Sequence, residues 1–361
     1  MFIKSAFLLL LLFTLEVNAY PGFRQLEFTE RQEKTLKLAV WYPSATPGKI
    51  EKAGDNPAFE GVSVIRDAPP AQGRHPLLVL SHGYNGNWRN LSWLAQAMAM
   101  QGYIVAAPDH PGTTTFDQNP EEAKKLWQRP RDISRVINFV TRSPRLFGAT
   151  DNGRIAALGH SLGGWTVLSL AGAQFDPGKF IDDCQPQPQR GDCVLINKLG
   201  IDSTLTRNAL SANYRDARIK AVVSLDLGLA PGFTHQSLSQ IDLPVLILAA
   251  QGDNVARLPA MQESGYLAAG IKPQWRQYDV IAGATHFSFM QLCKAGAETL
   301  LNQEAPGDGI ICRDLKGFNR IDLHKELAGR ISAFLSASLN YSAAADEKLS
   351  ERRQQHVETR D

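Results

Sequence analysis

Residues 159–164 read Gly-His-Ser-Leu-Gly-Gly, and this stretch decides the fold prediction. The apolar run 155–158 precedes it and a helix-like segment, 165–171, follows it. A serine flanked by glycines, at a tight turn from a strand into a helix, is typical of a nucleophile elbow, because a side chain in place of either glycine would collide with the crossing elements. The pattern predicts an activated Ser161. The alternative is an inert serine in a glycine-rich turn.

Candidate strands alternate with helical patterns on both sides of this elbow. Leu91, Leu94, Ala95 and Met98 have the spacing of an amphipathic helix that ends at Gly102, and further helices are expected at 133–140 and 320–335. Strands are expected at 36–42, 77–81, 103–107, 155–158, 220–225, 245–250 and 275–281. This alternation predicts an α/β fold with a mostly parallel central sheet and helices on both faces.

The first 19 residues have the composition of a secretory signal peptide. Lys4 precedes an apolar block, 6–15, and Val17-Asn18-Ala19 provides a small-x-small ending. We therefore expect export, periplasmic or secreted, after cleavage near Ala19. The block is too short for a transmembrane span, and an uncleaved anchor is the alternative.

The remaining sequence predicts one catalytic domain, 20–341, with a lid-like insertion at 174–218 and a charged tail at 342–361 that is mobile or forms a solvated helix. Lys and Arg number 38 against 36 Asp and Glu, a net charge of +2, and no basic run stands out. Nucleic acid is therefore not an expected partner. We expect a monomer.

The four cysteines all follow the expected cleavage site, so an oxidising compartment would allow disulfides. Three pairings are possible. We predict Cys184 with Cys193 and Cys293 with Cys312, because these pairs close two local loops rich in Pro, Gln and Gly. The spacing does not favour a zinc site, and neither a metal nor an organic cofactor is expected.

A serine nucleophile needs a histidine to take its proton and a carboxylate to hold that histidine. His286 follows the last expected strand and is the candidate base. Two aspartates follow strands at the carboxyl edge of the sheet. Asp253, 33 residues before His286, is favoured as the acid, and Asp226 is the alternative.

The oxyanion formed during acyl transfer needs preorganised donors. The backbone N–H groups of Leu162 and Tyr84 are the candidates, and His82 is expected to support their loop from a buried position. Candidate walls of the substrate pocket are Trp88, Leu229, Phe287, Phe289 and Met290.

Over nearly all of residues 20–361 the chain resembles the alpha/beta-hydrolase superfamily. More narrowly, it resembles predicted dienelactone-hydrolase-like proteins grouped with platelet-activating-factor acetylhydrolases. The matching segments are Val40-Trp41-Tyr42-Pro43, Val79-Leu80-Ser81-His82-Gly83, Gly102 to Ala107, Gly159 to Gly164, and His286-Phe287-Ser288-Phe289 leading to Cys293 and Cys312. The resemblance implies a serine esterase.

The chain departs from these relatives at two places, and the relatives differ in which aspartate they favour as the acid. Dienelactone hydrolases proper use a cysteine where this chain has Ser161, so their activity is not carried over. The acetylhydrolases favour Asp226 as the acid, whereas secreted cutinase-like polyester hydrolases, which the chain resembles more distantly, favour Asp253. The latter usually carry a tryptophan where this chain has Leu227-Gly228-Leu229.

The sequence therefore predicts an exported serine hydrolase that cleaves a small-molecule or lipid-like carboxylic ester through an acyl-enzyme. A non-catalytic ligand-binding member of the same fold is one alternative. An amidase or peptidase with the same triad is the other.

Overall fold

The structure is a computed structural model that describes residues 20–358 except 31–32, 45 and 253–255, with side chains described as far as Asn340. The proposed signal segment, 1–19, and Asp253 lie outside the described residues.

A ten-stranded sheet forms the centre, in the order β10-β9-β8-β7-β5-β6-β2-β1-β4-β3. Strands β5 to β10 are parallel to one another, β2 is antiparallel to both β6 and β1, and β3 is antiparallel to β4. The mostly parallel sheet that the sequence predicts is therefore present. The strands are β1 Gly22–Phe28, β2 Leu36–Tyr42, β3 Ile50–Ala53, β4 Val62–Arg66, β5 Arg74–Ser81, β6 Ile104–Asp109, β7 Ala149–His160, β8 Ile219–Leu225, β9 Val245–Gly252 and β10 Arg276–Thr285.

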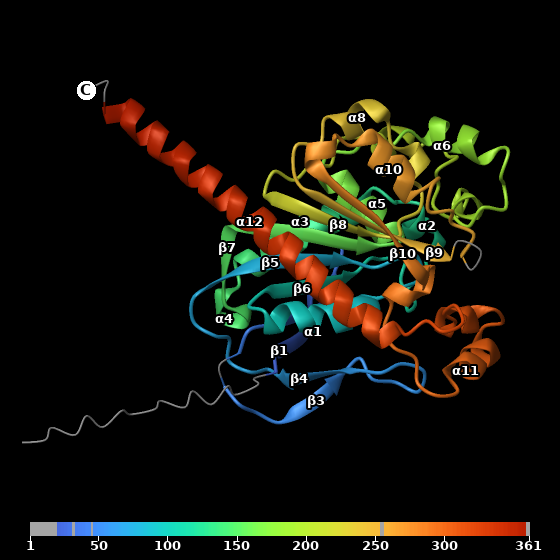
Figure 1. Cartoon of the computed structure of the whole chain (residues 1–361), viewed down its shortest axis with the longest axis horizontal. Coiled ribbons are helices and arrows are strands. Elements are labelled where there is room, and N and C mark those ends of the chain that lie inside the picture. The colour runs from blue at the N-terminus through green and yellow to red at the C-terminus, as the bar shows by residue number, and fades with distance from the viewer. Residues whose placement is uncertain (1–19, 31–32, 45, 253–255, 359–361) are drawn as a thin grey trace, which may run out of the picture.

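Helices cover both faces of this sheet (Figure 1). They are α1 Ser92–Met100, α2 Pro120–Ala123, α3 Gln128–Thr141, α4 Pro144–Phe147, α5 Leu162–Leu170, α6 Pro177–Cys184, α7 Arg207–Leu210, α8 His235–Ser239, α10 Ser264–Gly270, α11 Ala297–Glu304 and α12 Arg320–Glu358. Single 3₁₀ turns are η1 Trp88–Leu91, η2 Cys193–Leu195, η3 Ala230–Gly232, η4 Pro273–Trp275, η5 His286–Phe289 and η6 Asp308–Cys312.

Two apolar layers hold the helices to the sheet. Alternate residues of each central strand face opposite sides, so Leu77 and Val79 of β5 pack under α3 and α5, whereas Leu78 and Leu80 pack under α1 and α12. Because the parallel strands are buried on both faces, they consist of almost unbroken apolar runs.

The last helix is longer than the sequence predicts. The expected helix at 320–335 continues as α12 to Glu358, so the backbone of 342–358 is helical and projects beyond the sheet (Figure 1). No helix in the described part of the chain is both long and apolar enough to cross a lipid bilayer.

The insertion at 174–218 contains α6, η2 and α7. The disulfide Cys184–Cys193 closes one of its loops, and Cys293–Cys312 closes a second loop before α12. These are the two pairings that the sequence predicts. Disulfides persist in oxidising compartments, so they are consistent with an exported protein.

Candidate active site

Ser161 occupies a strained turn between β7 and α5. Its backbone has φ 56° and ψ −124°, a region that non-glycine residues rarely adopt. The glycines around it permit the close approach. A Cβ on Gly159 would lie 2.0 Å from the carbonyl oxygen of Gly163, and one on Gly163 would lie 1.9 Å from that of Ser81. This is the geometry of a nucleophile elbow.

His286 and Asp226 lie together at the carboxyl edge of the sheet. The Nδ1–H of His286 donates to Oδ2 of Asp226 at 2.6 Å, and Oδ1 of Asp226 accepts the N–H of Ala250 at 2.7 Å. Both side chains are buried. A proton on Nδ1 leaves Nε2 of His286 free to accept another.

His160, directly before Ser161, supports His286 from behind. Its Nε2–H donates to the carbonyl oxygen of His286 at 2.8 Å, and burial lowers the pKa of His160 well below its usual value. His160 is therefore uncharged and holds the backbone of His286 through this hydrogen bond. Its role could not be predicted from the sequence, because a histidine within the elbow motif has no distinctive spacing.

Ser161 and His286 line the same cavity, of about 230 Å³. Its other lining residues are Tyr84, Leu162, Gly191, Asp192, Leu195, Gly228, Leu229, Ala256, Leu258 and Phe287. The predicted wall residues Leu229 and Phe287 are therefore present, and so are the two candidate oxyanion donors.

Three predicted wall residues lie outside this lining. Trp88 is buried in the core, where its ring lies 5.5 Å from those of Phe23 and Trp41. Phe289 ends the turn η5 and packs into the layer beneath α12, and Met290 follows the turn. The prediction fails for Phe289 and Met290 because the chain turns at η5, so of Phe287, Phe289 and Met290 only Phe287 lines the cavity.

The loop after β5 brings Tyr84 to the elbow. A Cβ on Gly83 would lie 3.0 Å from Cβ of Ser161, so the peptide between Gly83 and Tyr84 lies beside the serine. The ring of His82 accepts the N–H of His110 at Nε2, at 2.9 Å, and its Nδ1–H donates to the carbonyl oxygen of Gly83 at 2.7 Å. Because a trans peptide points its C=O and N–H in opposite directions, this bond orients the N–H of Tyr84.

Arg129, on α3, supports the same loop from within the core. It donates to the hydroxyls of Thr113 and Thr166 at 2.6 and 3.1 Å, and to the carbonyl oxygen of His82. Burial lowers the pKa of Arg129 to about 9 and that of His82 to about 3, so the arginine is charged and the histidine neutral near pH 7.

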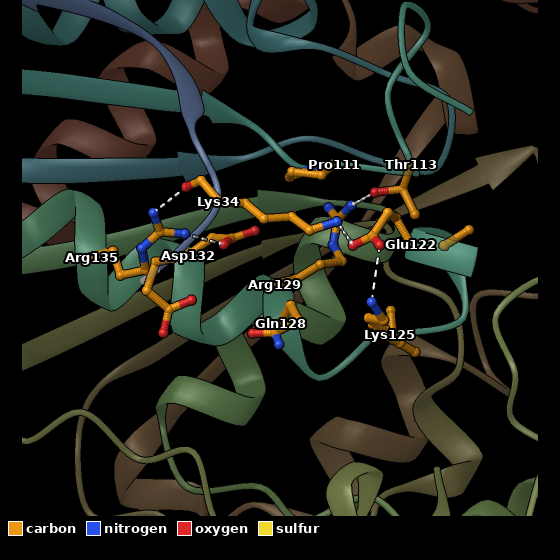
Figure 2. Close-up of a pocket in the computed structure, with 12 residues that line it drawn as sticks. Lys34, Pro111, Thr113, Glu122, Lys125, Gln128, Arg129, Asp132 and Arg135 are labelled. Carbon is orange, nitrogen blue, oxygen red and sulfur yellow. Dashed lines mark hydrogen bonds and ion pairs between the residues drawn. The ribbon is translucent and has the colours of Figure 1, made fainter. Parts of the chain in front are cut away.

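A second cavity of about 230 Å³ lies beside Arg129 (Figure 2). Five of its charged lining residues pair with one another: Glu122 contacts Lys34 and Lys125, and Arg135 contacts Asp132. Burial raises the pKa of Asp132 to about 7.

One group of potential metal ligands occurs in the described residues, formed by Cys184, Asp192 and Cys193. Both sulfur atoms belong to the disulfide, which does not leave them free as thiolate ligands.

The strand order, the elbow and the histidine–aspartate pair together define the class of fold. The chain has the alpha/beta-hydrolase fold, which the sequence resemblance implies.

Comparisons with known proteins agree with this class. Residues 72–180 match the family described as serine aminopeptidase, S33. A ferulic acid esterase from Streptomyces cinnamoneus has a similar structure, with a TM-score of 0.58, 18% identity and coverage of 89% of this chain and 90% of that one.

Two curated relatives are ester hydrolases by name. Bis(hydroxyethyl) terephthalate hydrolase of Streptomyces coelicolor is 23% identical over 64% of this chain and 56% of its own length. Cutinase 1 of Thermobifida cellulosilytica is 24% identical over 61% of this chain and 63% of its own length. The matched region thus spans less than two thirds of either relative.

Proposed function

We propose that the protein is a serine hydrolase of carboxylic esters, with Ser161 as nucleophile, His286 as base and Asp226 as the acid that holds His286. The observation that carries this proposal is the 2.6 Å bond between His286 and Asp226, in a cavity that both His286 and the strained Ser161 line. The names of the relatives support an ester rather than an amide substrate.

In this mechanism Nε2 of His286 takes the proton of the Ser161 hydroxyl as Oγ bonds to the acyl carbon. The carbonyl oxygen becomes an oxyanion, which the N–H groups of Leu162 and Tyr84 stabilise. The intermediate collapses, the C–O bond to the alcohol breaks, and His286 returns its proton to the leaving oxygen. A water molecule then attacks the acyl-enzyme by the same steps and releases the acid.

The cavity favours an uncharged acyl group. Its walls include Leu195, Leu229, Leu258 and Phe287, and the carboxylate of Asp192 is bonded to Arg190 at 2.7 Å. An aminopeptidase would need a free carboxylate for the substrate ammonium group, so this pairing favours an esterase. The insertion contributes Gly191, Asp192 and Leu195, consistent with a lid-like role.

We propose cleavage near Ala19, a catalytic domain at 20–341 and the narrower kinship with acetylhydrolase-like and dienelactone-hydrolase-like proteins. The two disulfides support export.

Turnover of p-nitrophenyl butyrate and of the matched butyryl p-nitroanilide tests the proposed activity, with Ser161→Ala as control. We expect the ester to be cleaved with a kcat/KM at least about 10³-fold above that of the anilide, and both activities to be lost in the variant. Preferred cleavage of the anilide would support the peptidase alternative. Ligand binding with neither reaction would support the non-catalytic one.

A further inference from the structure

The backbone just after Asp226 is held by two buried carboxylates. The N–H of Leu229 donates to Oδ2 of Asp192 at 2.9 Å, and the N–H of Ala230 donates to Oε2 of Glu263 at 2.8 Å. Leu229 is in the left-handed conformation, with φ 68° and ψ 9°, and its side chain lines the cavity. A non-glycine residue keeps this backbone only where its surroundings enforce it.

Arg190 joins these carboxylates. Its Nε lies 2.7 Å from Oδ1 of Asp192 and 3.4 Å from Oε1 of Glu263, and a terminal nitrogen lies 2.7 Å from Oδ2 of Asp183. The side chains of Arg190, Asp192 and Glu263 are only 2%, 3% and 2% exposed. Burial, followed by the charge of Asp192, raises the pKa of Glu263 well above its usual value.

The loop that carries Arg190 is itself fixed to the cavity. The Cys184–Cys193 disulfide closes it, and the N–H of Gly191 donates to the carbonyl oxygen of Arg257 at 2.9 Å. A Cβ on Gly191 would lie 2.0 Å from the carbonyl oxygen of Ala256. The loop therefore presses against a segment that also lines the cavity.

We propose that Arg190 is a positioning residue that determines acyl specificity, because it holds the insertion against Leu229 and Ala230 and so fixes one wall of the acyl pocket. This inference rests on the proposed esterase function. Without the guanidinium, Asp192 is left as a buried carboxylate with no cation, and the contact that joins it to Glu263 and to the insertion is lost. The Leu229 backbone then loses its partners and relaxes, and the pocket widens.

A series of p-nitrophenyl esters from acetate to octanoate tests the proposal on the mature chain. In Arg190→Gln we expect the ratio of octanoate to acetate kcat/KM to rise about tenfold, mainly through KM, with acetate kcat changed less than about threefold. Arg190→Lys should restore part of the wild-type ester preference, because lysine keeps the positive charge but lacks the planar guanidinium that can bind several carboxylates at once. Arg215→Gln is the matched control, since Arg215 lies in the same insertion but pairs with Asp242 at the surface.

Hydrogen exchange at the amides of Leu229 and Ala230 gives a readout that needs no turnover. We expect exchange at these two amides to be about tenfold faster in Arg190→Gln and unchanged in Arg215→Gln. Unchanged exchange, or an equal loss of activity with every ester, would overturn the positioning role. A wild-type chain that cleaves none of the esters would instead contradict the proposed function, and the exchange result would still decide whether Arg190 holds this wall.

Discussion

Asp226 uses both of its carboxylate oxygens, one on His286 and one on the N–H of Ala250. Two bonds fix the plane of the carboxylate, and its backbone, with φ 44°, is itself unusual. The imidazole is thereby held in the tautomer that can accept a proton from Ser161. In the proposed mechanism, the charge of Asp226 also stabilises the imidazolium that forms.

Asp226→Asn should lower kcat by about 10⁴-fold, because an amide favours the wrong tautomer of the histidine. Asp253→Asn is the matched control and should change kcat by less than about tenfold. Both variants are to be compared by ester turnover at equal folded fractions, checked by thermal unfolding. The opposite ranking would assign the acid to Asp253.

Which of these two aspartates meets His286 could not be predicted from the sequence. Ser161 and His286 are recognisable from the elbow and from the position after the last strand. Asp226 and Asp253 both follow strands that end at the same edge of a parallel sheet, so their spacing does not tell which of them the base meets. That depends on the turn after β8, whose positive φ values at Asp226 and Leu229 leave no signature in non-glycine residues.

Asp109, at the end of β6, provides a test of pH dependence. Burial raises its pKa from 3.8 to about 6, although its Oδ1 accepts the N–H of Trp88 at 2.8 Å. The folded chain therefore binds this proton more tightly than the unfolded chain, and the stabilisation present below pH 3.8 is lost as the pH rises through about 6.

Asp109→Asn keeps an acceptor for Trp88 and removes this titration. Relative to wild type, the unfolding free energy of the variant should rise by about 2 kcal/mol between pH 4 and pH 8. Urea unfolding at the two pH values measures the difference. An equal difference at both would show that Asp109 titrates normally.

At the scale of elements, the loop after β5 depends on His82 for its orientation. Asparagine places its amide nitrogen near the position of Nδ1, whereas glutamine places it near Nε2. His82→Asn should therefore keep the bond to Gly83, and His82→Gln should lose it.

We expect His82→Gln to lower kcat by about 10²-fold with little change in KM, since an oxyanion donor acts mainly in the transition state. His82→Asn should retain most of the activity. Ester kinetics of the two variants measure this, and equal losses in both would argue against orientation of the Tyr84 N–H.

The helix α3 shows why the buried polar support was not foreseen. Arg129 and Asp132 share the spacing of Ile133 and Val136 and lie on the same buried face. An apolar pattern predicts the helix, but charged residues in the same segment are expected to face solvent. Charges at apolar spacing were the available signal, and only the fold brings Arg129 to His82 and Thr166 and brings Asp132 to His110.

At the scale of the whole molecule, the parallel centre was predictable because each strand is an apolar run followed by a helical pattern. The outer strands β1, β3 and β4 were not predicted. β3 and β4 have only four and five residues, and β1, with seven, is partly exposed, so these strands lack the apolar run of a central strand. The insertion also lacked a readable pattern, since its contacts with the cavity depend on Arg190, a buried charge whose partners Asp192 and Glu263 lie far apart in the sequence.

Fluorophosphonate labelling of the mature protein, with mass spectrometry of the labelled peptide, tests the central claim most directly. The account predicts one label, on Ser161, that is lost in Ser161→Ala. A folded wild-type protein that takes up no label, or a label that persists in the variant, would contradict the assignment of an activated serine at the elbow.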